Sequence, residues 1–159
     1  MSDSEVRNTV SELRHFDVSL PMVLLRARES AMRQFRPVLA DHDLTEQQWR
    51  VLRALGSANE PIEVGALVER TSLLAPSLSR ILVNLEERGL IDRQTAAHDL
   101  RRSEISLSDV GRKLVATVAP ESEAVYTQIE ERYGSKRLHA LIGELSELTE
   151  LLHATEEPT

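Results

Sequence analysis

The run from Leu74 to Glu86 constrains the fold more than any other stretch of the sequence. Pro76 suits the first turn of a helix, where its missing N–H would be unpaired in any case. Four apolar residues follow at spacings of three and four: Leu78, Ile81, Leu82 and Leu85. That spacing places them on one face of a helix. Arg88 and then Gly89 provide a typical helix end. The run therefore predicts an amphipathic helix that begins near Pro76.

A second face of the same helix is polar. Ser77, Arg80 and Asn84 share the spacing of three and four, and Ser79 lies beside them. Hydroxyl, guanidinium and amide groups are the ones that hydrogen-bond base edges and phosphates. We therefore expect a DNA recognition helix, with Pro76 at its start and these four side chains against DNA.

The segments on either side support a winged helix. A short helix over 64–70 and a turn at 71–74 complete a helix-turn-helix. Two short strands follow at 90–93 and 103–107, around a polar loop at 94–102. Arg101 and Arg102 would lie at the hairpin tip and enter a minor groove. On the residue pattern alone, a helical hairpin with a solvated basic loop stays open.

The distribution of charge agrees with a DNA-binding module on an acidic body. The formal net charge is −7. Residues 70–113 contain eight basic and six acidic side chains, a balance of +2, which leaves −9 on the rest of the chain. The chain has no cysteine, so disulfides and thiol switches are excluded. No apolar run is long enough to span a membrane, and the polar start is no signal peptide, so we expect a cytoplasmic protein.

Long leucine-rich helices are predicted at both ends, over about 16–41 and 108–152. We expect one domain over 15–153, with the winged helix-turn-helix at about 45–107 and tails at 1–14 and 154–159. A single helix-turn-helix contacts few base pairs, so two copies are needed for a pseudo-palindromic site. The first of the long helices is apolar on more than one side near Met22, Val23 and Leu25, which suits burial in a partner chain. A monomeric helical bundle is the alternative.

Four motifs carry a resemblance to a known family: Leu44-Thr45 followed by Gln48 to Leu52; Pro76-Ser77-x-Ser79-Arg80; Leu85-Glu86-x-x-Gly89-Leu90-Ile91; and Asp99-x-Arg101 followed by Leu107-Ser108 and Gly111. Together they resemble MarR-type transcription regulators over residues 15–152. Further runs, Ser19 to Pro21, Ala27 to Glu29 and Phe35 to Pro37, resemble the subgroup of repressors that control breakdown of hydroxylated aromatic acids such as homoprotocatechuate. The resemblance implies a mainly α fold with a small β wing, and a dimeric repressor released by a phenolic or aromatic acid.

Arg28 is the leading candidate for contact with such an effector. It lies on a mostly apolar helix face, where a guanidinium needs a carboxylate partner. Ser19, Arg26 and Gln47 are further candidates, and Trp49 would supply an aromatic wall. A structural ion pair of Arg28 with Glu29, Glu46 or the partner subunit, and ordinary core packing of Trp49, are the alternatives.

No residue pattern indicates a cofactor, a metal site or catalysis. The five histidines show no paired metal-ligand spacing, and no nucleophile–base arrangement or glycine-rich phosphate loop is present. Two other functions stay open: a winged-helix regulator with no small-molecule effector, and a winged-helix module that binds protein. Steep weakening of binding by salt would distinguish DNA from a protein partner.

Overall fold

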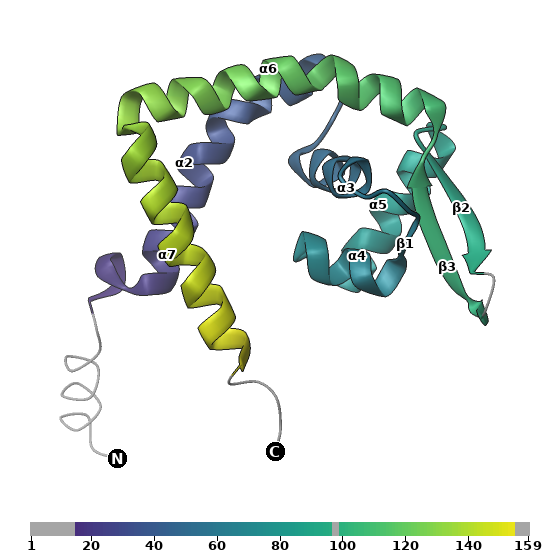
Figure 1. The fold of residues 1–159 in the computed structure, drawn as a ribbon, viewed down its shortest axis with the longest axis horizontal. Coiled ribbons are helices and arrows are strands. Elements are labelled where there is room, and N and C mark those ends of the chain that lie inside the picture. Colours follow the sequence, from purple (N-terminus) through teal and green to yellow (C-terminus); the bar gives the residue numbers. More distant parts are fainter. Residues whose placement is uncertain (1–14, 97–98, 155–159) are drawn as a thin grey trace, which may run out of the picture. The chain divides into compact units, whose positions relative to one another are not determined.

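The computed structural model describes residues 15–96 and 99–154 (Figure 1). The predicted tails lie outside these residues, except for Ala154. The chain separates into two compact units, Met1–Glu46 and Gln47–Thr159.

The first unit contains a short 3-10 helix, η1 (Phe16–Val18), and the long helix α2 (Leu20–Asp41). Ser19 lies between them, and its hydroxyl donates a hydrogen bond to the Phe16 carbonyl oxygen at 2.8 Å. Only Phe35 and Leu39 are buried in α2, whereas several apolar side chains in its first two turns are exposed. Such an apolar surface is typical of a helix that packs against another chain.

The second unit holds the helix-turn-helix. Helices α4 (Val64–Thr71) and α5 (Ala75–Glu87) form this motif, and α3 (Glu46–Gly56) precedes them in the chain. Ser72, at a φ of 51°, ends α4 in the left-handed conformation and turns the chain toward α5. The core of this unit is aliphatic and closely packed, with these side chains at most 1% exposed: Val51, Leu52, Leu67, Leu78, Leu82, Leu85, Ile105 and Val118.

A three-stranded antiparallel sheet forms the wing, in the order β1 (Ile62–Glu63), β3 (Asp99–Leu107) and β2 (Ile91–Ala96). The β2–β3 hairpin is prominent in Figure 1. Its strands are longer than predicted, and the expected loop over 94–102 was wrong, because Gln94 pairs with Glu104 and Thr95 with Ser103. The sequence also gave no sign of β1, whose Ile62 pairs with Ile105. Pairing between distant segments supplies what local propensity does not.

Two long helices complete the unit, α6 (Asp109–Tyr133) and α7 (Ser135–Ala154). Ser108 caps α6: its hydroxyl accepts a hydrogen bond from the Gly111 N–H at 2.9 Å. That hydroxyl also donates to the Gly89 carbonyl oxygen at 2.6 Å, which joins α6 to the end of α5. Pro120 lies within α6, which continues through it as one helix.

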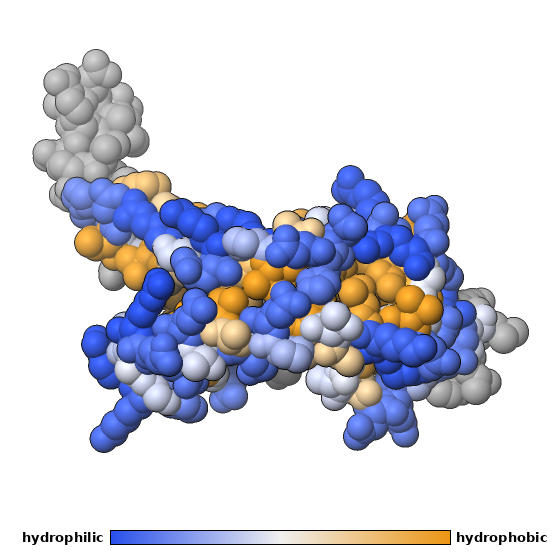
Figure 2. Space-filling view, turned by 90° about the horizontal axis from the view of Figure 1, so that it is seen from above, coloured by the Kyte–Doolittle hydropathy of each residue, from blue (hydrophilic) through white to orange (hydrophobic). Residues whose placement is uncertain are grey.

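Helix α7 buries none of its side chains in the single chain. Its exposed apolar residues include Leu141, Ile142, Leu145, Leu151 and Leu152. The space-filling view shows apolar side chains gathered on the surface between polar ones (Figure 2). An exposed apolar surface of this kind marks a site of association.

Candidate nucleic-acid interface and effector pocket

Helix α5 presents two distinct faces. Leu78, Leu82 and Leu85 are essentially inaccessible to solvent, so one face is fixed in the core. Pro76, Ser79 and Arg80 are exposed and Ser77 is half-buried, as the sequence predicted. The helix presents its hydroxyls and guanidinium to solvent because its apolar face is fully used in packing. This arrangement suits insertion into a DNA groove.

The N-terminal end of α5 is also open. Leu74 is the N-cap residue, and no side chain caps the helix there. The Leu74 side chain is 78% exposed. Uncapped backbone N–H groups at a helix start attract phosphate oxygens, and an exposed apolar side chain can contact a thymine methyl group.

Asn84 lies further along the polar face, where it has a partner inside the protein. The Gln48 side-chain amide of α3 donates a hydrogen bond to the Asn84 side-chain oxygen at 2.8 Å. The expected DNA contact of Asn84 is therefore restricted to its remaining amide nitrogen.

Two arginines of the wing, Arg93 and Arg102, form ion pairs with carboxylates. Arg102 contacts Glu63 of β1 at 2.9 Å, and its side chain is 60% exposed. Arg93 of β2 contacts Glu86 of α5 at 3.1 Å, which ties the wing to the recognition helix. Both pairs are near solvent, where such contacts contribute little to stability, so a DNA phosphate can replace the carboxylate. The Arg101 side chain lies outside what the structure describes.

A small pocket of about 210 Å³ opens beside α3 and α6. Trp49 and Arg53 of α3 line one side, and Ser122 and Glu123 of α6 line the other. The Arg53 guanidinium donates to the Tyr126 hydroxyl at 2.9 Å. It also lies 5.7 Å from the centre of that ring. An aromatic wall beside a cation is an arrangement that can hold an aromatic acid.

Ser122 gives the pocket an unusual polar atom. The residue is 2% exposed, and its hydroxyl has no hydrogen-bond partner within the described part of the chain. Buried hydroxyls nearly always have a partner. Ser122 also lines the pocket, but its oxygen is itself buried, so a ligand would reach this hydroxyl only after the pocket wall moved.

The arginines of the first unit have carboxylate partners. Arg26 pairs with Asp17 and Arg28 with Glu46. Glu46 also accepts from Arg36 at 3.1 Å. The hydrogen bond from Arg28 lowers the pKa of Glu46. Of the partners left open for Arg28 by the sequence, the structure shows Glu46.

Neighbouring charges reinforce this cluster. The pKa of Glu29 is lowered by its hydrogen bonds with Arg36, whose own pKa is raised. The lowered pKa values of Glu29 and Glu46 favour the ionised carboxylates that these ion pairs need.

The chain was compared with known proteins. Residues 42–102 match the sequence profile of the MarR family. The chain is 37% identical over 139 residues to the homoprotocatechuate degradative operon repressor of Escherichia coli, a match that covers 87% of this chain and 93% of the relative. The chain belongs to the MarR family.

Solved structures of MarR-type regulators agree with this assignment. The crystal structure of NadR in complex with 4-hydroxyphenylacetate matches with a TM-score of 0.75 and 35% identity, over 86% of this chain and 96% of NadR. The repressor CouR bound to a 23-mer DNA duplex matches with a TM-score of 0.75 and 26% identity, over 87% of this chain and 99% of CouR. The predicted family and fold class, mainly α with a winged helix-turn-helix, are confirmed.

In this MarR-family chain, the sequence analysis proposed Trp49 as an aromatic wall. It did not single out Arg53 and Ser122, which line the same pocket, or Tyr126, which contacts Arg53. Trp49 is 5% exposed, so it packs in the core and lines the pocket at once. The spacing of four between Trp49 and Arg53 was the available signal, since it places both on one face of a helix. Gln47 is exposed.

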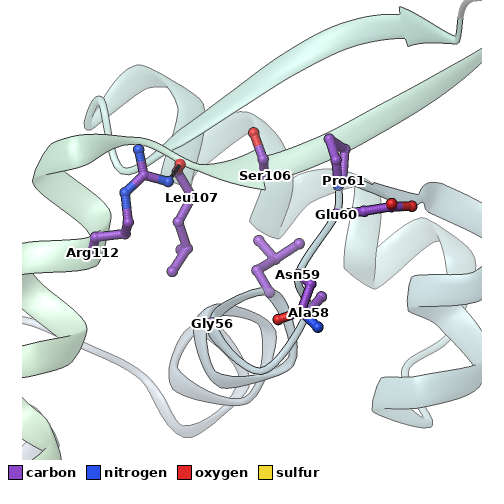
Figure 3. A pocket seen from close by; sticks show the side chains of 9 residues that line it. Gly56, Ala58, Asn59, Glu60, Pro61, Ser106, Leu107 and Arg112 are labelled. Atoms are coloured by element: carbon purple, nitrogen blue, oxygen red, sulfur yellow. Dashed lines mark hydrogen bonds between the residues drawn. The ribbon is translucent and has the colours of Figure 1, made fainter.

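A second pocket, of about 270 Å³, lies between the loop after α3 and the junction of β3 with α6 (Figure 3). Its cation, Arg112, donates to the Leu107 carbonyl oxygen at 2.6 Å and to Asp109 at 2.7 Å. Because a carboxylate already neutralises this guanidinium, the pocket is a poorer site for an anion than the one beside Trp49.

No helix in the described ranges is both long and apolar enough to cross a membrane.

Proposed function

We propose that this protein is a dimeric transcriptional repressor of an aromatic-acid catabolic operon, released from DNA by a small aromatic carboxylic acid. The single observation that carries the proposal is the polar face of α5, where Ser77, Ser79 and Arg80 lie opposite a buried apolar face formed by Leu78, Leu82 and Leu85. The role of the Escherichia coli relative supports the choice of regulated operon. The protein acts in the cytoplasm and is not an enzyme.

DNA contact begins with α5 in the major groove. Arg80 is suited to bind the O6 and N7 atoms of a guanine, and Ser77 and Ser79 to contact bases or phosphates beside it. Arg101 and Arg102 of the wing would contact the flanking minor groove. On binding, Arg102 would leave the Glu63 carboxylate and contact a DNA phosphate instead. Each arginine–phosphate contact makes the affinity for DNA more sensitive to salt.

Dimerisation is supported by the apolar surface of the end helices. Helix α7 exposes Leu141, Ile142 and Leu145, and α2 exposes Leu20 and Leu25. Two-fold association through these helices would bring two copies of α5 to successive major grooves, about 34 Å apart on one side of the duplex.

The proposed effector site is the pocket beside Trp49. A cavity of about 150 Å³ accommodates a benzene ring. The pocket of about 210 Å³ therefore suits one ring with a short acidic side chain. Arg53 would bind the carboxylate of the acid, and Trp49 would pack against its ring. The Ser122 hydroxyl would form a hydrogen bond with the ligand. Glu123 on the pocket wall would oppose a second negative charge.

Release of DNA requires that the acid bind the DNA-free conformation more tightly than the DNA-bound one. Ser19, Arg26, Arg28 and Gln47 stay an alternative set of effector contacts, in which Arg28 takes the place of Arg53 as the carboxylate anchor. Arg28 would first have to leave Glu46. Arg53 has a neutral phenol as its partner, so it is the better carboxylate anchor.

The experiment compares Arg53→Ala with the matched variant Arg28→Ala. An operator duplex is selected by the wild-type protein from a random pool, and its binding is followed by fluorescence anisotropy with increasing 4-hydroxyphenylacetate. We expect both variants to bind the duplex, Arg53→Ala to lose the response to the acid by at least tenfold, and Arg28→Ala to keep most of it. Failure of the wild-type protein to select any duplex would refute the proposed function. Loss of the response in Arg28→Ala alone would move the anchor to Arg28.

A further inference from the structure

We propose that Gln48 is a positioning residue for DNA recognition, which holds α5 through Asn84 and links it to the pocket beside Trp49. The proposal rests on the proposed function, because it assigns a route between the two sites named there. It adds a residue that contacts neither the DNA nor the effector.

The geometry of α3 carries the first step. Successive residues of an α-helix are about 100° apart around the axis, so neighbours in sequence point to different sides. Trp49 and Arg53 line the pocket. Gln48, one residue before Trp49, points to α5 and donates to the Asn84 side-chain oxygen at 2.8 Å. One short helix therefore contacts the pocket and the recognition helix with adjacent side chains.

The rigidity of α3 carries the second step. Val51, Leu52 and Leu55 are at most 5% exposed and fix the helix in the core. Packed interiors transmit a displacement instead of absorbing it. A ligand that shifts Trp49 or Arg53 must therefore shift Gln48 as well.

A second contact joins α3 to the rest of the helix-turn-helix. The Arg50 guanidinium donates to the backbone carbonyl oxygen of Thr71 at 3.0 Å. Thr71 is the last residue of α4 and is buried. Helix α3 thus holds the end of α4 through Arg50 and the side of α5 through Gln48. Any movement of α3 reaches both helices.

The position of Asn84 explains why this contact affects recognition. Recognition helices contact base edges mainly with residues near their N-terminal end, where Ser77 and Arg80 lie. Asn84 lies near the other end of α5, and its oxygen is engaged by Gln48. The pair therefore adds a polar contact to the buried Leu82 and Leu85, and helps to hold the orientation in which α5 presents Arg80 to the groove.

The test is a double-mutant cycle with Gln48→Met and Asn84→Ala. Methionine keeps the length of the side chain and removes the amide. The control Gln34→Met makes the same change at an exposed position of α2. For each variant, binding to the selected operator duplex and to a scrambled duplex is measured, with and without 4-hydroxyphenylacetate. Thermal unfolding and Trp49 fluorescence titrations record stability and acid binding.

We expect each single variant to lose about 3- to 10-fold in operator affinity, the size of one hydrogen bond, with scrambled-duplex affinity unchanged. The double variant should lose no more than Asn84→Ala alone, because Gln48 acts through Asn84. The acid should still bind Gln48→Met within twofold of wild type, but its effect on operator binding should fall at least threefold. The exchanged pair Q48N/N84Q restores an amide–amide contact and should recover part of the loss.

Two results would overturn the inference while the proposed function stands: additive losses in the cycle, or a Gln48→Met variant whose operator affinity and acid response match Gln34→Met. If the wild-type protein binds the operator but the acid does not release it, the effector claim fails and the DNA measurements alone decide the role of Gln48. Absence of operator binding by the wild-type protein would overturn both.

Discussion

Ser122→Ala should change stability and effector affinity in opposite directions. The Ser122 hydroxyl is buried and has no partner among the described residues. An unpaired buried hydroxyl costs about 1–3 kcal/mol. Alanine removes that hydroxyl and fills the same backbone position, so the free energy of unfolding should rise by about 1 kcal/mol. For a protein of this size the midpoint of thermal unfolding should rise by roughly 2–4 °C.

The same substitution should weaken binding of an aromatic acid by about 2- to 10-fold, because one hydrogen bond to the ligand is lost. The unfolding temperature and the affinity for the acid are measured at one protein concentration, because the unfolding temperature of a dimer depends on that concentration. Thermal unfolding gives the first, and titration of Trp49 fluorescence with 4-hydroxyphenylacetate gives the second.

Alanine also favours helix more than serine does, so a control is needed. Ser146→Ala makes the same change at an exposed helical position whose hydroxyl donates to the Ile142 carbonyl oxygen at 2.9 Å. The reasoning is refuted if Ser122→Ala is no more stable than Ser146→Ala, or if its affinity for the acid is unchanged.

Three further predictions concern the fold and the assembly. Gly111→Ala would place a Cβ 2.0 Å from a backbone carbonyl oxygen, so denaturant unfolding should show a loss of about 1–3 kcal/mol, whereas Gly143→Ala, with open space around it, should be neutral or slightly stabilising. The pKa of Glu46 is lowered from 4.5 by Arg28, so its stabilisation is complete above that pH and is lost as the pH falls through the lowered value. Glu46→Gln should flatten the acid limb of the stability curve, and an unaltered limb would contradict this. Leu145→Asp should convert the dimer to a monomer in analytical ultracentrifugation, and an intact dimer would place the interface elsewhere.

Much of the fold could be predicted because its signals are local. The apolar spacing within α5 fixed its extent to within one residue at each end, since the helix runs from Ala75 to Glu87. Gly89 was identified as part of the helix end, and it takes the positive φ of 68° that glycine allows. In both cases the deciding contacts lie within one helical turn.

The rest depended on contacts between distant residues. The wing was predicted too short because residues 94–102 are polar, and their pairing across the hairpin is not visible in their own composition. Arg53 contacts Tyr126, 73 residues away, and Gln48 contacts Asn84, 36 residues away. Arg28 drew attention because it lies on an apolar stripe, but its carboxylate partner Glu46 comes from the start of the next helix. Local periodicity locates faces of helices, whereas the partners of those faces come from the tertiary fold.

The central claim is that the polar face of α5 binds a specific DNA sequence. It is tested most directly by the affinity of Arg80→Ala for the selected operator duplex and for a scrambled duplex at several salt concentrations, beside the control Arg33→Ala on the exposed side of α2. A lost bidentate contact to guanine corresponds to about 1–3 kcal/mol, or roughly 5- to 150-fold in operator affinity. The account predicts that loss for Arg80→Ala alone, with scrambled-duplex affinity falling far less. Equal affinities of Arg80→Ala and Arg33→Ala for the operator would contradict it.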